Sequence, residues 1–201
     1  MIDMSYLDDF CSLHRLNEPK DIVGFSCGDK DLDDFFTNDC FAYDKQLLGK
    51  TYCYKLDQEP HHIVCAFTLA NAGIRVSDLP NARRKKIETH IPHEKSLKDY
   101  PAVLVARLGV SVDFRSKHIG SDVLENLKYW FLDPYNKTGC RYVLVDAYNS
   151  APTIRFYESN GFATVFSSEE QEKEYRHISG ERPLNTRLMY FDLIQLAKDD
   201  K

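Results

Sequence analysis

The feature that most constrains the fold is the segment PAVLVARLGVSV at residues 101–112, which is almost wholly apolar and rich in Val and Leu. A strand with one face in water would carry polar residues at every second position. Continuous apolar character is typical instead of a strand buried on both faces, as in parallel sheets. A second such segment, CRYVLVDAYN at 140–149, follows a helical pattern at 120–135. This order of strand, helix and strand predicts a parallel pair in an α/β sheet.

The rest of the chain supplies further helices and strands. Apolar residues at intervals of three and four predict an amphipathic helix at 28–48, opened by Gly28 and Asp29. The segments TYCYKL and HHIVCAFTLANA, separated by DQEP, predict a hairpin. A short helix is expected in NARRKKIETHI and another in APTIRFYESNGF, and TRLMYFDLI predicts a final strand after a charged excursion. The expected fold is a mixed α/β sheet.

Length and composition predict a single domain spanning residues 1–201. The hydrophobic fraction of 43% is sufficient to bury a core. The net charge of −5 argues against general binding to a nucleic-acid backbone, because phosphate contacts need clustered Lys and Arg. A local basic run does occur, at Arg83, Arg84, Lys85 and Lys86. It fits either a solvated helix face or a surface for an acidic partner.

The targeting and cysteine patterns predict a cytoplasmic protein. The N-terminus, MIDMSYLDDFCSL, has no cationic start before an apolar run, so no signal peptide is expected, and no apolar run approaches membrane-spanning length. The six cysteines form no CxxC pair and are expected to be buried, reduced thiols. No metal site is expected, because zinc needs a tighter Cys/His cluster.

The segment DFRSKHIGSDVL, residues 113–124, joins the first buried strand to the next helix. A helix that begins directly after a strand presents unpaired N–H groups and the positive end of its dipole there, which favours an anion. Arg115 and Lys117 add positive charge. Taken alone, the segment fits a plain connection between a strand and a helix at least as well as a phosphate site.

Two motifs together carry a family resemblance. LGVSVDFRSKHIGSDVL resembles motif A of the GCN5-related N-acetyltransferases, roughly Leu-x-Val, four residues, then Arg/Gln-x-x-Gly-x-Gly/Ala, with His118 in place of the middle glycine. DAYNSAPTIRFYESNGF resembles the second signature of the family, because Phe156, Tyr157, Glu158, Gly161 and Phe162 match it in register.

The resemblance extends over most of residues 21–193. FSCGDKDLDDFF, FTLANAGI and LPNARRKKIETHIP followed by YPAVLVARLGV are similar to the branch that includes toxins of bacterial toxin–antitoxin pairs. The charged excursion at 167–187 is longer than in the compact members of the family.

The resemblance implies a fold and a cosubstrate. The fold is a mixed, mostly antiparallel sheet with a splayed parallel strand pair, flanked by helices, and the cosubstrate is acetyl-CoA, with its pantetheine arm between the splayed strands. The strand backbone of Leu108, Gly109 and Val110 would contact that arm, and the amides of residues 116–121 would hold the pyrophosphate. The implied cosubstrate-binding residues are Leu108, Gly109, Val110, Arg115, Ser116, Lys117, His118, Ile119, Gly120 and Ser121, with Asn149 and Ser150 competing for the role of the asparagine in the second motif.

His118 is the one departure inside the loop. We expect it to donate its amide while its ring points to solvent or toward the 3′-phosphate of CoA. A Cβ is tolerated there provided that the backbone is not strongly left-handed, although His accepts that region better than most residues.

The resemblance also implies catalytic roles. Tyr157 is the candidate general acid, because a phenol close to the thioester sulfur can protonate the departing CoA thiolate. Core packing is the alternative for a Tyr in a short apolar helix, but the surrounding FYESNGF favours catalysis. Asp146 is a weaker candidate for the base that deprotonates the incoming amine; water, or no base at all, is an equal alternative.

Three functions are compatible with these residues. The first is transfer of an acetyl group from acetyl-CoA to a primary amine of a small molecule, peptide or protein. The second is a toxin that acetylates aminoacyl-tRNA, with tRNA and an antitoxin as partners; the resemblance and the basic run favour it and the net charge opposes it. The third, a non-catalytic acyl-CoA-binding module, is disfavoured by the intact Tyr157. An oligomer is compatible with all three, and none involves a membrane.

Overall fold

The computed structural model describes residues 5–92 and 97–197, and it divides the chain into two compact units. Unit 1 combines residues 1–71 with 105–127, and unit 2 combines 72–104 with 128–201. The prediction of one domain spanning 1–201 stays a prediction, and each unit is described by itself below.

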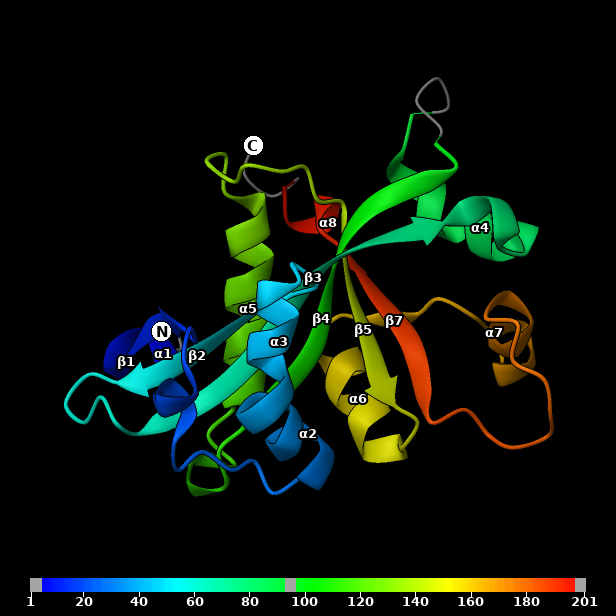
Figure 1. The fold of residues 1–201 in the computed structure, drawn as a ribbon. Coiled ribbons are helices and arrows are strands. Elements are labelled where there is room, and N and C mark those ends of the chain that lie inside the picture. Colours follow the sequence, from blue (N-terminus) through cyan, green and yellow to red (C-terminus); the bar gives the residue numbers. More distant parts are fainter. Residues whose placement is uncertain (1–4, 93–96, 198–201) are drawn as a thin grey trace. The chain divides into compact units, whose positions relative to one another are not determined.

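Within the described residues the strands form one hydrogen-bonded series in the order β1-β2-β3-β4-β5-β7-β6 (Figure 1). The strands are β1 (Cys11–Arg15), β2 (Lys50–Leu56), β3 (Ile63–Arg75), β4 (Asp99–Val110), β5 (Tyr142–Tyr148), β6 (Ala163–Thr164) and β7 (Thr186–Asp192). The helices are α1 (Tyr6–Phe10), α2 (Lys30–Asp34), α3 (Cys40–Lys45), α4 (Asn81–Ile87), α5 (Ile119–Leu132), α6 (Ala151–Ser159), α7 (Glu169–Tyr175) and α8 (Ile194–Ala197).

The strand directions confirm the predicted fold class. The pairs β1–β2, β2–β3, β5–β7 and β6–β7 are antiparallel. The pair β4–β5 is parallel, and α5 lies between these two strands in the sequence. The two continuous apolar segments at 101–112 and 140–149 are therefore the strands of the parallel pair, as the sequence predicts.

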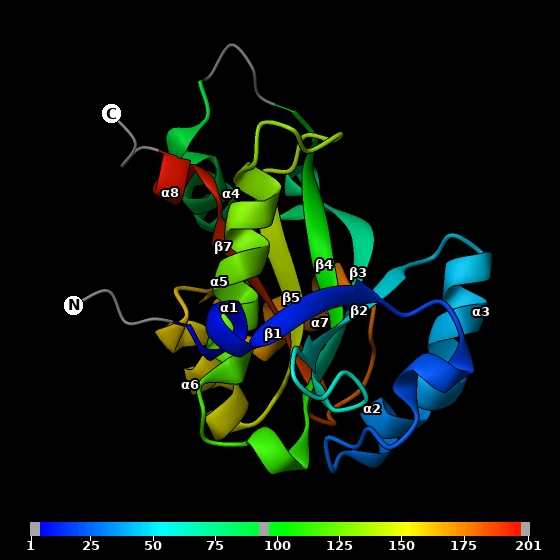
Figure 2. The same ribbon diagram turned by 90° about the vertical axis from the view of Figure 1, so that its left-hand side faces the viewer.

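Unit 1 is a sheet with helices on both faces. The segment containing α2 and α3 covers one face, and the part of α5 that belongs to this unit covers the other (Figure 2). The predicted hairpin is β2–β3, where Thr51 lies opposite Thr68 and their buried hydroxyl oxygens are 2.8 Å apart. The core beneath α2 and α3 consists of Leu16, Ile22, Phe35, Phe36, Cys40, Phe41, Cys53, Ile63 and Ala66.

The helix predicted at 28–48 is interrupted by one wider turn. Asp29 caps α2 by accepting hydrogen bonds from the amides of Asp31 and Leu32, and a π-helical turn, η2 (Phe35–Asp39), joins α2 to α3. Phe35 and Phe36 are adjacent in the sequence, and both are buried. We infer that the wider turn lets both rings reach the core, which a regular helix would do less easily.

Unit 2 is built around the antiparallel pair β5–β7, in which Val143 lies opposite Phe191 and Val145 opposite Met189. Its core consists of Ile74, Val76, Leu79, Ile87, Tyr100, Ala102, Tyr142, Leu144, Val165, Phe166 and Tyr190. The hydroxyl of Tyr142 donates to the carbonyl oxygen of Ile87 at 2.9 Å, which fixes the end of α4 on this core.

The basic run on α4 is only partly available to a partner. Arg83 donates to the carbonyl oxygens of Val165 and Thr164 at 2.7 and 2.5 Å, so it holds α4 against the chain next to β7. Arg84 pairs with Glu88 at 3.0 Å. Lys85 and Lys86 are exposed. Half of the run therefore has a structural role.

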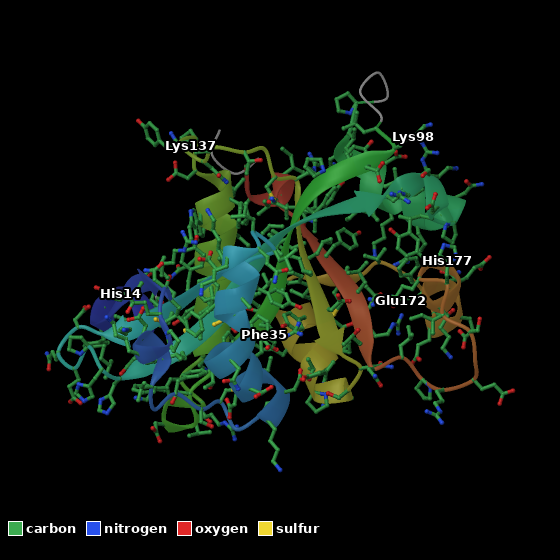
Figure 3. The ribbon with its side chains drawn as sticks, viewed as in Figure 1. His14, Phe35, Lys98, Lys137, Glu172 and His177 are labelled. Atoms are coloured by element: carbon green, nitrogen blue, oxygen red, sulfur yellow. The ribbon has the colours of Figure 1, made fainter. Side chains whose placement is uncertain are left out.

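The charged excursion contains a helix that the sequence analysis did not predict. Glu172 lies in α7 (Figure 3) and is fully buried. Its carboxylate accepts from Arg187 Nε, Arg176 Nη2 and the amide of Leu188, each at 2.7 Å. Because three donors surround this carboxylate, its burial is compensated. Glu172 thereby fastens α7 to β7.

Four other elements were also missed: α1, β1, β6 and α8. The reason is clearest for β1, where Cys11 is buried and the four following residues are exposed. An edge strand of this kind has no alternation of apolar and polar residues, so periodicity does not detect it.

Two predictions about the bulk of the chain can be compared with the structure. All six cysteines are free, and five of them are buried; Cys140 is half-buried. Among the described residues, no helix is both long and apolar enough to cross a membrane.

The Glu172 cluster generates the first prediction. Glu172→Ala would leave the partly buried guanidinium of Arg187 without its counter-charge and Arg176 with Asp146 alone, so we expect the free energy of unfolding to fall by about 3–5 kcal/mol. Urea unfolding followed by circular dichroism measures this loss. Glu174→Ala removes an exposed carboxylate from the same helix and should change stability by less than about 0.5 kcal/mol. Equal losses in the two variants would contradict the assignment.

Candidate active site

The loop predicted to bind pyrophosphate lies in unit 1, between β4 and α5. Ser111 ends the strand, and its amide donates to the carbonyl oxygen of Val64 at 2.9 Å. A short 3-10 turn, η6 (Val112–Phe114), follows, and α5 begins at Ile119. The amides of residues 116–120 donate to no acceptor within the described part of the protein, whereas the amide of Ser121 donates to the carbonyl oxygen of His118 at 2.9 Å. Five consecutive amides at a helix N-terminus are thus unpaired, and Ser121 is used by the helix itself.

The backbone of this loop is left-handed at two positions, Ser116 with φ of 63° and His118 with φ of 57°. His118 therefore does not meet the expected condition, which was a backbone that is not strongly left-handed. The side chain of His118 is exposed. A residue with a Cβ in this region stores strain unless its surroundings fix the conformation.

The two cations of the loop both contact other residues of unit 1. Arg115 Nη2 donates to the carbonyl oxygen of Cys27 at 2.7 Å. Lys117 Nζ lies 4.7 Å from the ring centroid of Tyr6 and 5.1 Å from that of Phe114. Arg115 thus fastens the loop to the segment before α2, while Lys117 keeps an exposed charge beside aromatic rings.

Residues 26–28 are themselves held in place by α2. The carboxylate of Asp33 accepts from the Ser26 hydroxyl and the Cys27 amide, both at 2.7 Å, and the carbonyl oxygen of Ser26 accepts from the amide of Val112 at 3.0 Å. Gly28 has φ of 78°, and a Cβ there would lie 2.7 Å from Arg115 Nη2. Only glycine fits this position without moving the arginine.

Gly109, in the predicted pantetheine-binding edge Leu108 to Val110, also has little space around it. A Cβ at Gly109 would lie 3.1 Å from the Cys27 side chain and 3.2 Å from Phe36 Cε2. Cys27 is buried, and this burial raises its thiol pKa to about 11. The thiol is therefore protonated at neutral pH and serves as packing rather than as a nucleophile.

Unit 2 contains the residues of the second motif, at the end of β5 and in α6. The Ser150 hydroxyl accepts from the amide of Thr153 at 3.4 Å and caps α6. The Asn149 side chain donates to Glu169 Oε1 at 2.8 Å and to the carbonyl oxygen of Leu184 at 2.9 Å. Asn149 therefore ties the end of β5 to the charged excursion. Which of the two serves the role of the motif's asparagine stays open.

Tyr157 lies in α6 between two other aromatic rings. Its ring centroid is 5.0 Å from that of Phe156 and 5.6 Å from that of Phe162. Its hydroxyl makes no hydrogen bond to any other described residue. Burial alone raises the pKa of Tyr157 to about 12. The phenol is therefore neutral at physiological pH and retains a proton that it can donate.

Asp146 projects from β5 and is ion-paired. Arg176 Nη2 lies 2.5 Å from Asp146 Oδ1 and also contacts buried Glu172. The ion pair with Arg176 therefore occupies one oxygen of the Asp146 carboxylate. The sequence analysis missed Arg176 and Glu172, although their spacing of four residues in EEQEKEYR is that of a helical ion pair.

One exposed group of possible metal ligands lies away from these motifs. In the turn between β2 and β3, ligand atoms of Glu59, His61 and His62 lie within 4.8 Å of one another. Glu59 Oε2 and His62 Nδ1 are 2.6 Å apart, and all three residues are exposed. The sequence analysis did not single out this group, and the prediction of no metal stays a prediction.

His118 generates the second prediction. Because a β-branched residue is strained at positive φ, His118→Val should lower the free energy of unfolding by about 1 kcal/mol and weaken acetyl-CoA binding about fivefold. His118→Gly should bind acetyl-CoA as the wild type does. Calorimetric titration with acetyl-CoA and thermal unfolding measure both effects.

The control for this experiment is His177→Val. His177 is also exposed and has φ of 55°, but it follows α7 in unit 2. It should lose similar stability without any change in acetyl-CoA affinity. Tightening by more than tenfold in His118→Gly would instead show that the histidine impairs binding.

The profile of the family described as "Acetyltransferase (GNAT) domain" matches residues 42–164, which is more than half of the chain. A tRNA-acetylating toxin of Mycobacterium tuberculosis (strain ATCC 25618 / H37Rv) is 22% identical over 141 residues, which are 70% of this chain and 78% of that protein.

Two solved structures share the fold over nearly their whole length. AtaT complexed with acetyl-methionyl-tRNAfMet is 17% identical with a TM-score of 0.69, covering 95% of this chain and 99% of its own. AtaTR bound with AcCoA is 16% identical with a TM-score of 0.64, covering 96% of this chain and 99% of its own.

Proposed function

The chain belongs to the GNAT acetyltransferase family, and we propose that it transfers the acetyl group of acetyl-CoA to the amino group of an aminoacyl-tRNA. As a member of this family it is an acyltransferase that uses acetyl-CoA. The observation that carries the choice of acceptor is similarity to a tRNA-acetylating toxin along 70% of the chain. A likeness in fold to AtaT in complex with acetyl-methionyl-tRNAfMet agrees with this acceptor.

In this proposal the loop after β4 binds the pyrophosphate of acetyl-CoA. The unpaired amides of residues 116–120 and the N-terminal end of α5 provide donors and a positive dipole for an anion. Lys117 adds an exposed positive charge, while Arg115 holds the loop in shape through Cys27. The backbone of Leu108, Gly109 and Val110 would contact the pantetheine arm.

Tyr157 would act on the leaving group. The amine nitrogen attacks the thioester carbonyl carbon, the tetrahedral oxyanion collapses, the C–S bond breaks, and the sulfur leaves with the bonding electrons. The Tyr157 phenol donates to this sulfur and later regains a proton from solvent. A phenol pKa of about 12 lies above that of a free thiol, but burial that disfavours phenolate also disfavours a thiolate in the same surroundings.

Removal of the amine proton does not depend on a strong base here. The Asp146 carboxylate is paired with Arg176, and the amine needs only to be neutral when it attacks. We propose that the amine loses its proton to water, with Asp146 as a candidate that must first separate from Arg176.

A small-molecule or peptide amine is the second candidate for the acceptor. It is favoured by the net charge of −5 and by the internal bonds of Arg83 and Arg84, which leave Lys85 and Lys86 as the exposed cations of that run. If the tRNA proposal holds, the protein acts in the cytoplasm and an antitoxin is the expected protein partner.

The third prediction concerns the acceptor. We expect acetylation of aminoacyl-tRNA, measured as release of free CoA thiol and as acetyl-aminoacyl product, with a rate that falls as salt increases because phosphate contacts are screened. The same tRNA without its amino acid is the control and should not be acetylated. Turnover with small amines or peptides, but with no aminoacyl-tRNA, would favour the second candidate.

The fourth prediction concerns Tyr157. Tyr157→Phe should lower kcat about a hundredfold or more and leave acetyl-CoA affinity unchanged, because only the donated proton is lost. Because the phenol pKa is raised to about 12, the wild-type kcat should show no alkaline loss due to this residue up to about pH 10. Tyr129→Phe, on the exposed surface of α5, is the matched control. An unchanged kcat in Tyr157→Phe would remove Tyr157 from the mechanism.

A further inference from the structure

Arg107 is a cation on β4 that neither motif explains. Side chains alternate along a strand, so Arg107 and Gly109 project to the same side. On that side Gly109 lies against Cys27 and Phe36. Arg107 Cζ lies 4.9 Å from the ring centroid of Phe35. Phe35 is in the π-helical turn η2 (Figure 3). Arg107 therefore projects toward the helical segment of unit 1, one residue before the predicted pantetheine-binding edge.

The guanidinium of Arg107 is incompletely satisfied. Nη1 donates to the carbonyl oxygen of the neighbouring Ala106 at 2.8 Å, while Nε is buried without a hydrogen-bond partner. Within the described ranges, no carboxylate forms an ion pair with it. Arg141 and Arg176 also have a buried Nε without a hydrogen bond, but each forms an ion pair, Arg141 with Asp192 and Arg176 with Asp146 and Glu172. A buried N–H of a cation without an acceptor costs free energy, and Arg107 has no counter-charge among the described residues to offset that cost.

The aromatic platform beneath Arg107 is rigid. Phe35 is buried, and its ring centroid lies 5.6 Å from Phe36 and 5.3 Å from Tyr43, both in edge-to-face geometry. This packing fixes the ring on which the guanidinium rests, and the cation–π contact offsets part of the missing counter-charge. Single π-helical turns within helices are often found at functional sites. Arg107 is thus pre-positioned without being neutralised.

We propose that Arg107 binds a phosphate oxygen at the acceptor end of the aminoacyl-tRNA. The inference rests on the proposed function and adds a residue that recognises its substrate. Guanidinium groups suit phosphate because their N–H groups form a planar fork that two oxygens can accept. The proposed function assigns the pyrophosphate of acetyl-CoA to the amides of residues 116–120, beyond the end of the strand, so we assign Arg107 to the other substrate.

The experiment compares Michaelis constants for the two substrates. Arg107→Met keeps an unbranched side chain over Phe35 and removes the charge and the donors. We expect KM for aminoacyl-tRNA to rise about tenfold or more and KM for acetyl-CoA to stay within about twofold. Lys137→Met, which removes one exposed positive charge after α5, is the control and should change neither constant by more than about twofold.

The outcomes separate the inference from the proposed function. If KM for acetyl-CoA rises instead, Arg107 binds the cosubstrate and the inference is overturned. If neither constant changes, it is also overturned, while wild-type turnover of aminoacyl-tRNA still supports the function. Absence of that turnover in the wild type would overturn both.

Thermal unfolding shows whether Arg107→Met folds properly. If it does not, a second variant tests the inference. Arg107→Lys keeps the charge but lacks the fork, and we expect KM for aminoacyl-tRNA to rise about threefold or more. An unchanged constant in this variant would overturn the inference.

Discussion

The shape of the loop after β4 depends on its hydrogen bonds to residues 26–28. Arg115 donates to Cys27, and Val112 donates to Ser26. Asp33, at the start of the helical segment, holds these two acceptor residues in turn. This chain of bonds allows left-handed backbone at Ser116 and His118 without glycine at either position. The unpaired amides of the loop therefore owe their geometry to a segment about ninety residues earlier in the chain.

In unit 2 the charged excursion has the corresponding structural role. Asn149, at the end of β5, is tied to Glu169 and Leu184, and buried Glu172 joins α7 to β7 through Arg187. Arg176 extends this network to Asp146. The excursion thus holds Asp146 in an ion pair and so determines whether it is available as a base. Through Asn149 it also fixes the end of β5, after which α6 with Tyr157 begins. Tyr157 needs no polar partner to stay protonated, because a phenol is neutral at neutral pH and burial raises its pKa further, to about 12.

Two arginines show that composition is a poor guide to charge available for ligands. Arg83 belongs to the most basic stretch of the sequence, yet it satisfies two backbone carbonyl oxygens. Arg107 lies in the most apolar stretch, yet it has a buried donor without an acceptor. Of these two arginines, the one with unmet bonding capacity is the one in the apolar stretch, because bonding capacity depends on neighbours and not on residue counts.

The sequence by itself determined the strands of the parallel pair, the β2–β3 hairpin and the cap at Asp29, because local periodicity and backbone preference encode them. Two spaced motifs were sufficient to indicate the family. Only the tertiary structure decided that His118 is left-handed, that Arg115 bonds to Cys27, and that Asp146 pairs with Arg176. Each of these depends on a partner distant in the sequence, or on strain that such a partner stabilises. Local pattern carries no information about such partners, so the edge strand β1 and the π-helical turn were also beyond it.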